Sequence, residues 1–384
     1  MDNLLKKVDI RKIAFTLVLF MIISRKYIIS FVSPEINMNI VKSLLFYASI
    51  GILGLLFITE RKKSMSELLL VGSCCILYLL NREGAILLIV LLATVVKNLD
   101  DKYVIKNYLI ISGIFLVIAL LVFNLFPWLE FNKEIHYRYI AKTDSLAVRM
   151  DYGLGNPNAI FYHMVTIYAS YIFLRFKKYN MVDRVILFAS TYFIYETTYS
   201  RTGAYTIFAG LIFVEIIRFM DIKNIKPLKI LAKISPIIIT VISVIIGYFF
   251  YDNYMANRLL ASRPKYWHVY LAQAGNLLKP FGNTYNSTIK SLNPLDSSYI
   301  YIVCVLGLIS LILFMYILYK GIGSFIEKDK KAYLTVVVIF LIYSFAENIL
   351  LEAAFSFPMV LLMKEFMLMD KNQIDIYKML RRKS

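Results

Sequence analysis

Repeated apolar runs constrain the fold of this chain more than any other feature. The runs are about 17–20 residues long, and short charged segments separate them. Because a helix needs about 20 apolar residues to cross the hydrocarbon core of a bilayer, each run predicts a membrane helix. With 59% hydrophobic residues and a mean hydropathy of +0.66, the chain is more apolar than soluble domains. We therefore expect an all-α integral membrane protein.

A sliding hydropathy window of about 19 residues indicates about twelve transmembrane helices. The predicted ranges are 13–32, 40–58, 65–81, 84–96, 108–126, 158–174, 185–200, 202–219, 231–250, 297–319, 333–349 and 351–369. We interpret residues 1–384 as a single polytopic membrane domain. Its basic start precedes an apolar run without a small-residue cleavage site, so the first helix is expected to stay uncleaved.

The distribution of basic residues predicts the orientation of the chain. The formal net charge of +18 could indicate nucleic-acid binding. Lys and Arg lie, however, in short clusters between the apolar runs, as in Arg61-Lys62-Lys63. The side of the N-terminus carries about twice as many basic residues as the other side, which marks it as cytoplasmic. We expect a multi-pass protein of the cytoplasmic (cell) membrane, with both termini cytoplasmic and no nucleic-acid partner.

Two long segments fall on the outer side in this topology. They are residues 127–157 and 251–296, and the second forms a large extracytoplasmic loop rich in Arg and aromatic residues. It shows no obvious structure of its own. Because connections of that length are usually functional, we expect the function to lie on the outer face.

Three predicted helices that enter from the outer side begin with polar residues. The starts are Asn156-Pro157-Asn158, Ser200-Arg201 and Asp296-Ser297. A helix start presents free N–H groups and the positive end of the helix dipole, which favour anions. Four arginines accompany them, namely Arg149, Arg201, Arg258 and Arg263. Because a planar guanidinium suits phosphate, the sequence predicts a phosphate-binding site at the outer surface.

Structural interpretations of the same residues stay open. Asn156, Ser200 and Ser297 could serve only as N-caps. Arg201 could reach the membrane interface as an anchor.

Other polar positions also have two interpretations. His268 beside Trp267 could be an interfacial pair or contribute to the site. Glu347, at the end of an apolar run, could be a boundary residue or form an ion pair with an arginine. We interpret a further set of basic residues as ordinary flanking charges of the helices, namely Arg25, Lys26 and Arg82.

Motifs of several soluble enzyme classes are absent from the sequence. There is no Walker glycine loop, no G-x-G-x-x-G, no G-x-S-x-G elbow and no zinc-spaced cluster. The cysteines Cys74, Cys75 and Cys304 lie in apolar runs and are interpreted as small buried hydrophobic residues. We therefore expect no cofactor and no metal site, and a magnesium-dependent nucleotide-sugar enzyme is not supported.

Four short motifs carry a resemblance that covers more than half of the chain. They are Gly155-Asn156-Pro157-Asn158, similar to G-x-P-N; Ser200-Arg201-Thr202-Gly203, similar to S-R-T/S-G; Arg263 with Trp267, similar to R-x-x-x-W; and Asp296-Ser297 followed after nine residues by Gly307, similar to H-[NSQ]-x9-G. In this order, on about twelve helices with a large late loop, they resemble the O-antigen and capsular polysaccharide polymerase family (Wzy) and the related O-antigen ligases. The ligases have His where this chain has Asp296, which favours a polymerase over a ligase.

This resemblance implies a membrane-embedded, metal-independent, inverting glycosyltransferase of the GT-C type. It would transfer a growing glycan from one undecaprenyl diphosphate to the sugar end of another lipid-linked repeat unit, as in capsule or exopolysaccharide biosynthesis. The donor and acceptor lipid-linked oligosaccharides and the membrane lipid are then its partners. A chain-length regulator and a flippase are further candidate partners.

The residues support this chemistry independently. Arginines can stabilise a diphosphate leaving group without a metal. Asp296, where the large loop re-enters the membrane, is the candidate catalytic base, and His268 is the reserve candidate. The candidate substrate-binding residues are Arg149, Asn156, Asn158, Arg201, Arg258, Arg263, Trp267, Tyr299 and Glu347.

A transporter is the second class that the sequence allows. A flippase for the same lipid-linked unit would also have about twelve helices and cationic residues. It should, however, show two related halves and charges deep within its helices. Here the charges cluster at helix ends, which favours the enzyme. A purely structural scaffold has no positive feature to support it.

Overall fold

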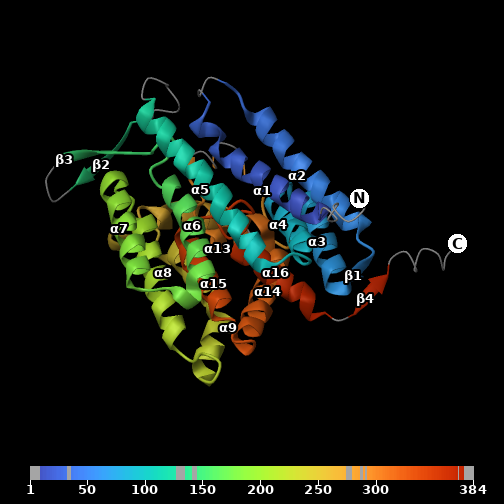
Figure 1. Cartoon of the computed structure of the whole chain (residues 1–384). Helices are drawn as coiled ribbons and strands as arrows, with labels where there is room; N and C mark the ends of the chain where they lie inside the picture. The colour runs from blue at the N-terminus through green and yellow to red at the C-terminus, as the bar shows by residue number, and fades with distance from the viewer. Residues whose placement is uncertain are drawn as a thin grey trace.

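The structure is a computed structural model that describes residues 9–32, 36–126, 135–140, 145–273, 279–285, 289, 292–370 and 372–375. It is a bundle of α-helices with two small two-stranded sheets (Figure 1). The helices in the first half are α1 (Ile10–Tyr27), η1 (Ile28–Ser30), α2 (Asn39–Thr59), α3 (Met65–Asn81), α4 (Ala85–Val96), α5 (Asp101–Leu125), α6 (Ala159–Arg175), η2 (Phe176–Lys178) and α7 (Met181–Thr198). Those in the second half are α8 (Arg201–Phe219), α9 (Lys226–Phe249), α10 (Tyr254–Leu259), α11 (Arg263–Gln273), α13 (Ser298–Tyr301), the π-helix η3 (Ile302–Leu306), α14 (Gly307–Glu327), α15 (Lys331–Ala346) and α16 (Phe357–Met369).

A helix lies in each of the twelve predicted ranges, so the protein is an all-α membrane protein. Six helical segments are long and apolar enough to cross a membrane among the described residues, namely α2, α5, α6 with η2, α8, α9 and the continuous stretch Ser298–Glu327. Others are shorter. The 12 residues of α4 rise only about 18 Å, against a hydrocarbon core of about 30 Å. A topology of twelve complete spans therefore stays a prediction.

The most apolar helix lies inside the bundle and not against lipid. Every residue of α4 from Ile86 to Val96 is buried, and α4 packs against α16 and α2. By contrast, only 11% of the apolar window of α2 is buried, and Figure 1 shows α2 and α5 on the outside of the bundle. Cys74 and Cys304 are buried, as predicted. Cys75 on α3 is exposed, so its predicted burial is wrong.

Ion pairs and a short sheet join the segments that were predicted to share the cytoplasmic face. Lys97 pairs with Glu67, and Lys364 pairs with Asp101 at 2.6 Å. Strand β1 (Lys62–Ser64) pairs antiparallel with β4 (Gln373–Asp375). These contacts place the loop after α2 and the segment after α16 at one end of the bundle, as the charge alternation requires.

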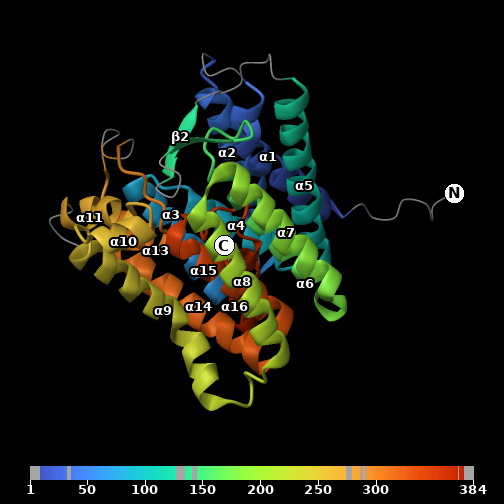
Figure 2. The same cartoon turned by 90° about the vertical axis from the view of Figure 1, so that its left-hand side faces the viewer.

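The large loop packs against the bundle through α11. Trp267 is fully buried, and its ring lies 5.5 Å from that of Phe345 on α15. A Cβ on Gly247 of α9 would come within 2.9 Å of the Trp267 side chain, so the small residue permits this close approach. Figure 2 shows α10 and α11 beside α9. The expectation that the loop lacks structure of its own is therefore wrong for its described residues.

The end of the large loop packs against the helical stretch Ser298–Glu327 at Gly307, where the backbone departs from helical geometry. Gly307 has φ 84° between η3 and α14, a conformation that favours glycine. A Cβ there would lie 2.1 Å from the backbone nitrogen of Gly282. The backbone N–H of Asn283 also donates to the carbonyl of Cys304 at 2.9 Å. This docking positions the start of α13, where the candidate site lies.

Candidate functional site

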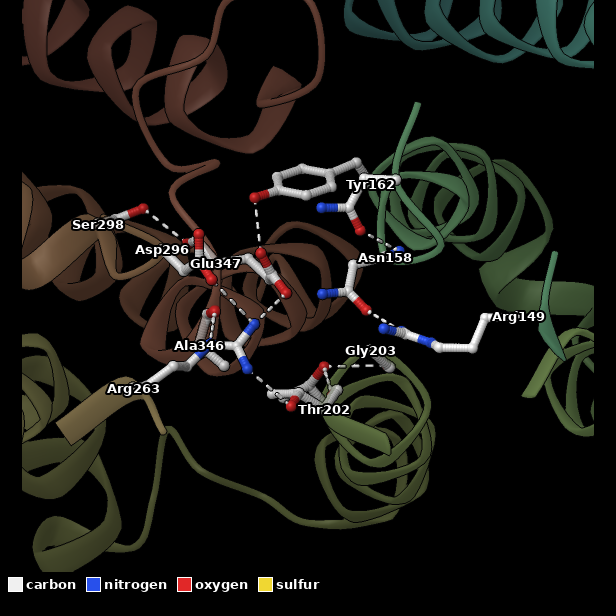
Figure 3. A network of polar contacts seen from close by, with 12 residues as sticks. Arg149, Asn158, Tyr162, Thr202, Gly203, Arg263, Asp296, Ser298, Ala346 and Glu347 are labelled. Carbon is white, nitrogen blue, oxygen red and sulfur yellow. Dashed lines mark hydrogen bonds and ion pairs between the residues drawn. The ribbon is translucent and has the colours of Figure 1, made fainter. Parts of the chain in front are cut away.

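Arg263, the first residue of α11, is the centre of a buried polar network (Figure 3). Its side chain is only 3% exposed. Nε donates to the carbonyl of Ala346 at 2.8 Å, and Nη1 donates to Thr202 Oγ1 at 2.9 Å. Nη2 donates to Glu347 Oε1 at 2.7 Å. One guanidinium thus ties the large loop to the start of α8 and to the end of α15.

A second carboxylate faces the same guanidinium. Asp296 Oδ2 lies 3.3 Å from Nη2 of Arg263. The Asp296 side chain is 26% exposed, whereas that of Glu347 is 2% exposed. The two carboxylates therefore differ in access, and only Asp296 reaches the surface of the site.

Glu347 is held in place by side chains from two other elements. Its Oε2 accepts a hydrogen bond from the hydroxyl of Tyr162 at 2.6 Å. Ser298 donates to its backbone carbonyl at 3.1 Å and accepts from the N–H groups of Ile349 and Leu350 at 3.0 Å each. The interpretation of Glu347 as the partner of an arginine is confirmed, and its oxygens are already occupied by the protein.

Burial shifts the proton affinity of Asp296, which lies at the end of the large loop before α13. It raises the pKa of Asp296 above its ordinary range, while the positive charge of Arg263 opposes the shift. A raised pKa makes Asp296 a stronger base than a solvated aspartate.

A second cluster joins three of the predicted residues. Arg149, from strand β3 (Ser145–Arg149), donates from Nε to the carbonyl of Thr198 at 2.7 Å and from Nη2 to Asn158 Oδ1 at 3.0 Å. The backbone N–H of Asn158 donates to Asn156 Oδ1 at 2.8 Å. Strand β3, paired with β2 (His136–Ile140), thereby links the start of α6 to the segment before α8.

Arg201 differs from Arg263 because part of its guanidinium has no hydrogen-bond partner among the described residues. Its Nη2 donates to the backbone carbonyl of Arg258 at 3.2 Å. Its buried Nε has no hydrogen-bond partner, and no ion pair with a carboxylate occurs in the described part of the chain. Arg201 directly precedes Thr202, a partner of Arg263, so both residues belong to the first turn of α8.

The simple N-cap interpretation is wrong for two residues. Ser200 and Ser297 occupy the N-cap positions of α8 and α13, but neither side chain makes a capping hydrogen bond. Both hydroxyls are buried and lack a partner among the described residues. The N-cap of α6 is Asn158 and not Asn156. The hydroxyls of Ser200 and Ser297 therefore do not cap these helices.

Three further predicted site residues, His268, Trp267 and Tyr299, make contacts of other kinds. His268 stacks on Tyr251 with ring centroids 3.6 Å apart, and its Nδ1 lies 3.2 Å from the carbonyl of Gly247. Trp267 is buried in the packing described above. Tyr299 is also buried, and its hydroxyl donates to the carbonyl of Leu341 at 2.9 Å.

The sequence-based prediction missed several contributors. Tyr162 lies one helical turn after Asn158 on α6, and this spacing could have suggested it. Thr202 stood within a quoted motif but had no role. The structure also contains a cavity of about 440 Å³ whose lining includes Arg25, Lys26 and Arg82, the three residues interpreted as flanking charges.

No group of three His, Cys, Asp or Glu side chains that could hold a metal occurs in the ranges that the structure describes. The expectation of a metal-independent site stays a prediction. Comparison with protein-family models, curated protein sequences and solved structures finds no match to this chain.

Proposed function

We propose that this protein is a polysaccharide polymerase. It joins undecaprenyl-diphosphate-linked oligosaccharide repeat units at the outer face of the cytoplasmic membrane by inverting glycosyl transfer. One observation carries the proposal: Arg263 holds Asp296, a partly exposed carboxylate of raised pKa, beside the helix start that bears the unpaired Arg201. A base and an anion-stabilising group at a membrane surface suit transfer from a lipid diphosphate.

Asp296 is the proposed base of the reaction. The acceptor hydroxyl oxygen attacks the anomeric carbon of the donor glycan, and its proton passes to Asp296. The bond from that carbon to the diphosphate oxygen breaks, and the electron pair leaves with the diphosphate. Because the proton is transferred as charge develops on the sugar, the position of the carboxylate matters as much as its pKa.

Arg201 is the proposed stabiliser of the diphosphate leaving group, with the exposed Arg258 beside it. Because no carboxylate among the described residues pairs with Arg201, its positive charge can stabilise the negative charge that develops on the diphosphate. Arg263 takes a different role from the one expected from the sequence. Since its donors already bind Ala346, Thr202 and the two carboxylates, we assign it to positioning Asp296.

The test uses purified protein in lipid nanodiscs with lipid-linked repeat units, and the products are separated on a gel. The wild-type protein should give a ladder of polymers. Asp296→Asn should lower the rate by about 10²-fold or more, whereas Asp252→Asn, at an exposed aspartate of the same loop, should leave it unchanged. A ladder formed at normal rate by Asp296→Asn would overturn the assignment of the base.

A deletion strain separates polymerase from transporter. Loss of a polymerase leaves single lipid-linked repeat units on the outer face of the membrane, where added glycosidases can reach them. Loss of a flippase instead traps the same units on the cytoplasmic side, and that result would contradict the proposed activity.

A further inference from the structure

The cavity of about 440 Å³ lies at a junction of segments that are distant in sequence. Its lining comes from the end of α1, the start of α2, the turn between α3 and α4, and residues 348–354. In the predicted topology all four segments lie on the outer side. The volume lies within the range of about 300–1,000 Å³ that small-ligand pockets occupy.

Three cations and two carboxylates line this cavity, Arg25, Lys26 and Arg82 against Glu83 and Glu352, so the formal charge of its lining is positive. Lys26 pairs with Glu352, and Glu83 Oε2 accepts a hydrogen bond from Tyr301 at 2.9 Å. Arg25 lies over the ring of Phe46 at 5.1 Å. Neither Arg25 nor Arg82 forms an ion pair among the described residues. Two unpaired arginines at one cavity favour an anion, and phosphate suits their planar donors best.

The backbone at Arg82 is itself unusual. It has φ 60° at the C-cap of α3, where its N–H donates to the carbonyl of Tyr78 at 2.9 Å. Glycine or asparagine is the ordinary choice at such a left-handed position. Strained residues of this kind are concentrated at ligand sites, and here the strained residue lines the cavity.

A second hollow adjoins the cavity on the surface of α2. It has a volume of about 610 Å³ and shares Ser43 and Tyr47 with the cavity lining. Its apolar residues are widely exposed, Ile40 at 77% and Leu44 at 64%. Since α2 is a candidate span with most of its window unburied, this groove would face the bilayer in the predicted topology. A cationic cavity beside an apolar groove matches a ligand with an anionic head and a long apolar chain.

We propose that the cavity binds the diphosphate of a polyprenyl lipid and that the groove on α2 holds its chain. Identifying this lipid as the acceptor substrate rests on the proposed function. Neither Asp296 nor Arg263 lines the cavity, so a diphosphate held there is not the one whose bond breaks. Asn348 lines the cavity and directly follows Glu347, so a glycan on this lipid can extend from the cavity towards Asp296.

The binding test uses the full chain in phosphatidylcholine nanodiscs with undecaprenyl diphosphate as the probe. The double substitution Arg25→Ala and Arg82→Ala should weaken binding by about tenfold or more, because each arginine contributes charge-assisted hydrogen bonds. Double substitution by Lys should restore part of the affinity, since Lys lacks the planar fork. Lys320→Ala, at an exposed cation on α14, should change nothing. Unchanged binding by a folded double Ala variant would overturn the proposal.

A second arm distinguishes a lipid from a soluble anion. Ser43→Trp places a large ring where the cavity meets the groove. It should weaken binding of undecaprenyl diphosphate by about tenfold but leave binding of inorganic pyrophosphate unchanged. If pyrophosphate competes as well as the lipid does, and Ser43→Trp has no effect, the groove has no role and the inference of a lipid is wrong.

The same variants separate this inference from the proposed function. Arginine-dependent binding of undecaprenyl diphosphate by a protein that makes no polymer would support the cavity and contradict the polymerase. Normal polymer from the double Ala variant with unchanged lipid binding would support the polymerase and contradict the proposed lipid site in the cavity. If both proposals hold, Asp296→Asn should bind the lipid normally and make no polymer.

Discussion

At the scale of single residues, the site depends on two carboxylates that share one guanidinium. Glu347 is enclosed, and both its oxygens are bound, one by Tyr162 and one by Arg263. Asp296 is partly exposed and approaches the same guanidinium at 3.3 Å. Glu347 therefore serves to hold Arg263, and Asp296 remains able to accept a proton.

The raised pKa of Asp296 gives a prediction about pH. The carboxylate must be ionised to act as a base, so activity should fall as pH drops through this raised pKa, above the ordinary aspartate value of about 3.9. A pH profile of kcat/KM measures this acid limb. An acid limb at or below the ordinary aspartate pKa would contradict the assignment.

The same shift predicts the stability of Asp296→Asn. A carboxyl group whose pKa is raised on folding stabilises the protein below its unfolded pKa, and this contribution is lost as pH rises through the folded pKa. The Asn variant should therefore have a higher Tm than the wild type at neutral pH, with the difference shrinking in acid. A lower Tm at neutral pH would show that pairing with Arg263 outweighs burial.

Arg201 is expected to act through its charge and its planar shape. Arg201→Ala should lower polymerisation by about 10²–10³-fold, because one donor to the leaving group is lost. Arg201→Lys should recover only part of this rate. The measurement is the rate of ladder formation at matched protein levels. Full-length polymer from Arg201→Ala at a normal rate would reduce the residue to an interface anchor.

At the scale of secondary-structure elements, α11 is the piece of the large loop that builds the site. Its buried Trp267 packs against α15 and close to α9. Its first residue, Arg263, reaches α8 and the end of α15. A helix held by both packing and polar contacts can place a carboxylate more reproducibly than a free loop.

A pair of variants tests how Arg263 connects these elements. Arg263→Met alone should destabilise the protein by about 3–5 kcal/mol, because it leaves Glu347 buried without its partner. Adding Glu347→Leu should restore most of the stability but not the polymer, since Asp296 still lacks its positioning residue. Thermal unfolding in detergent and ladder formation are measured together. Recovery of polymer along with stability would assign Arg263 to folding alone.

At the scale of the whole molecule, the polar contacts gather at two ends of an apolar bundle. The pairs of Lys97 with Glu67 and of Lys364 with Asp101 lie at the predicted inner end. The Arg263 network and the basic cavity belong to segments that were predicted at the outer end. This separation is what a protein with an outer-face site requires.

Cysteine labelling tests the orientation across α9. In a variant without the native cysteines, Asp252→Cys should react with a membrane-impermeant maleimide added to intact cells. Lys226→Cys, at the other end of α9, should react only after the membrane is opened. The two positions flank one candidate span. The reverse pattern would place the site in the cytoplasm and contradict the proposed function.

The sequence by itself determined where the apolar helices lie. Hydropathy over about 20 residues is a local property, so each predicted range contains a helix. It also identified the charged members of the Arg263 network, namely Arg263, Asp296 and Glu347, because charged residues at the ends of apolar runs are costly unless they have a role. Local signals did not show the fold of the large loop, whose α11 depends on contacts with α9 and α15.

Only the tertiary structure decided which helices face lipid and which charges meet. Lipid and protein interior are similarly apolar, so hydropathy does not distinguish the buried α4 from the exposed α2. Arg263 binds residues 83 and 84 positions away, and Arg25 and Arg82 line the same cavity. Such pairings depend on how the helices pack, and for that reason three apparent flanking charges became a candidate lipid site.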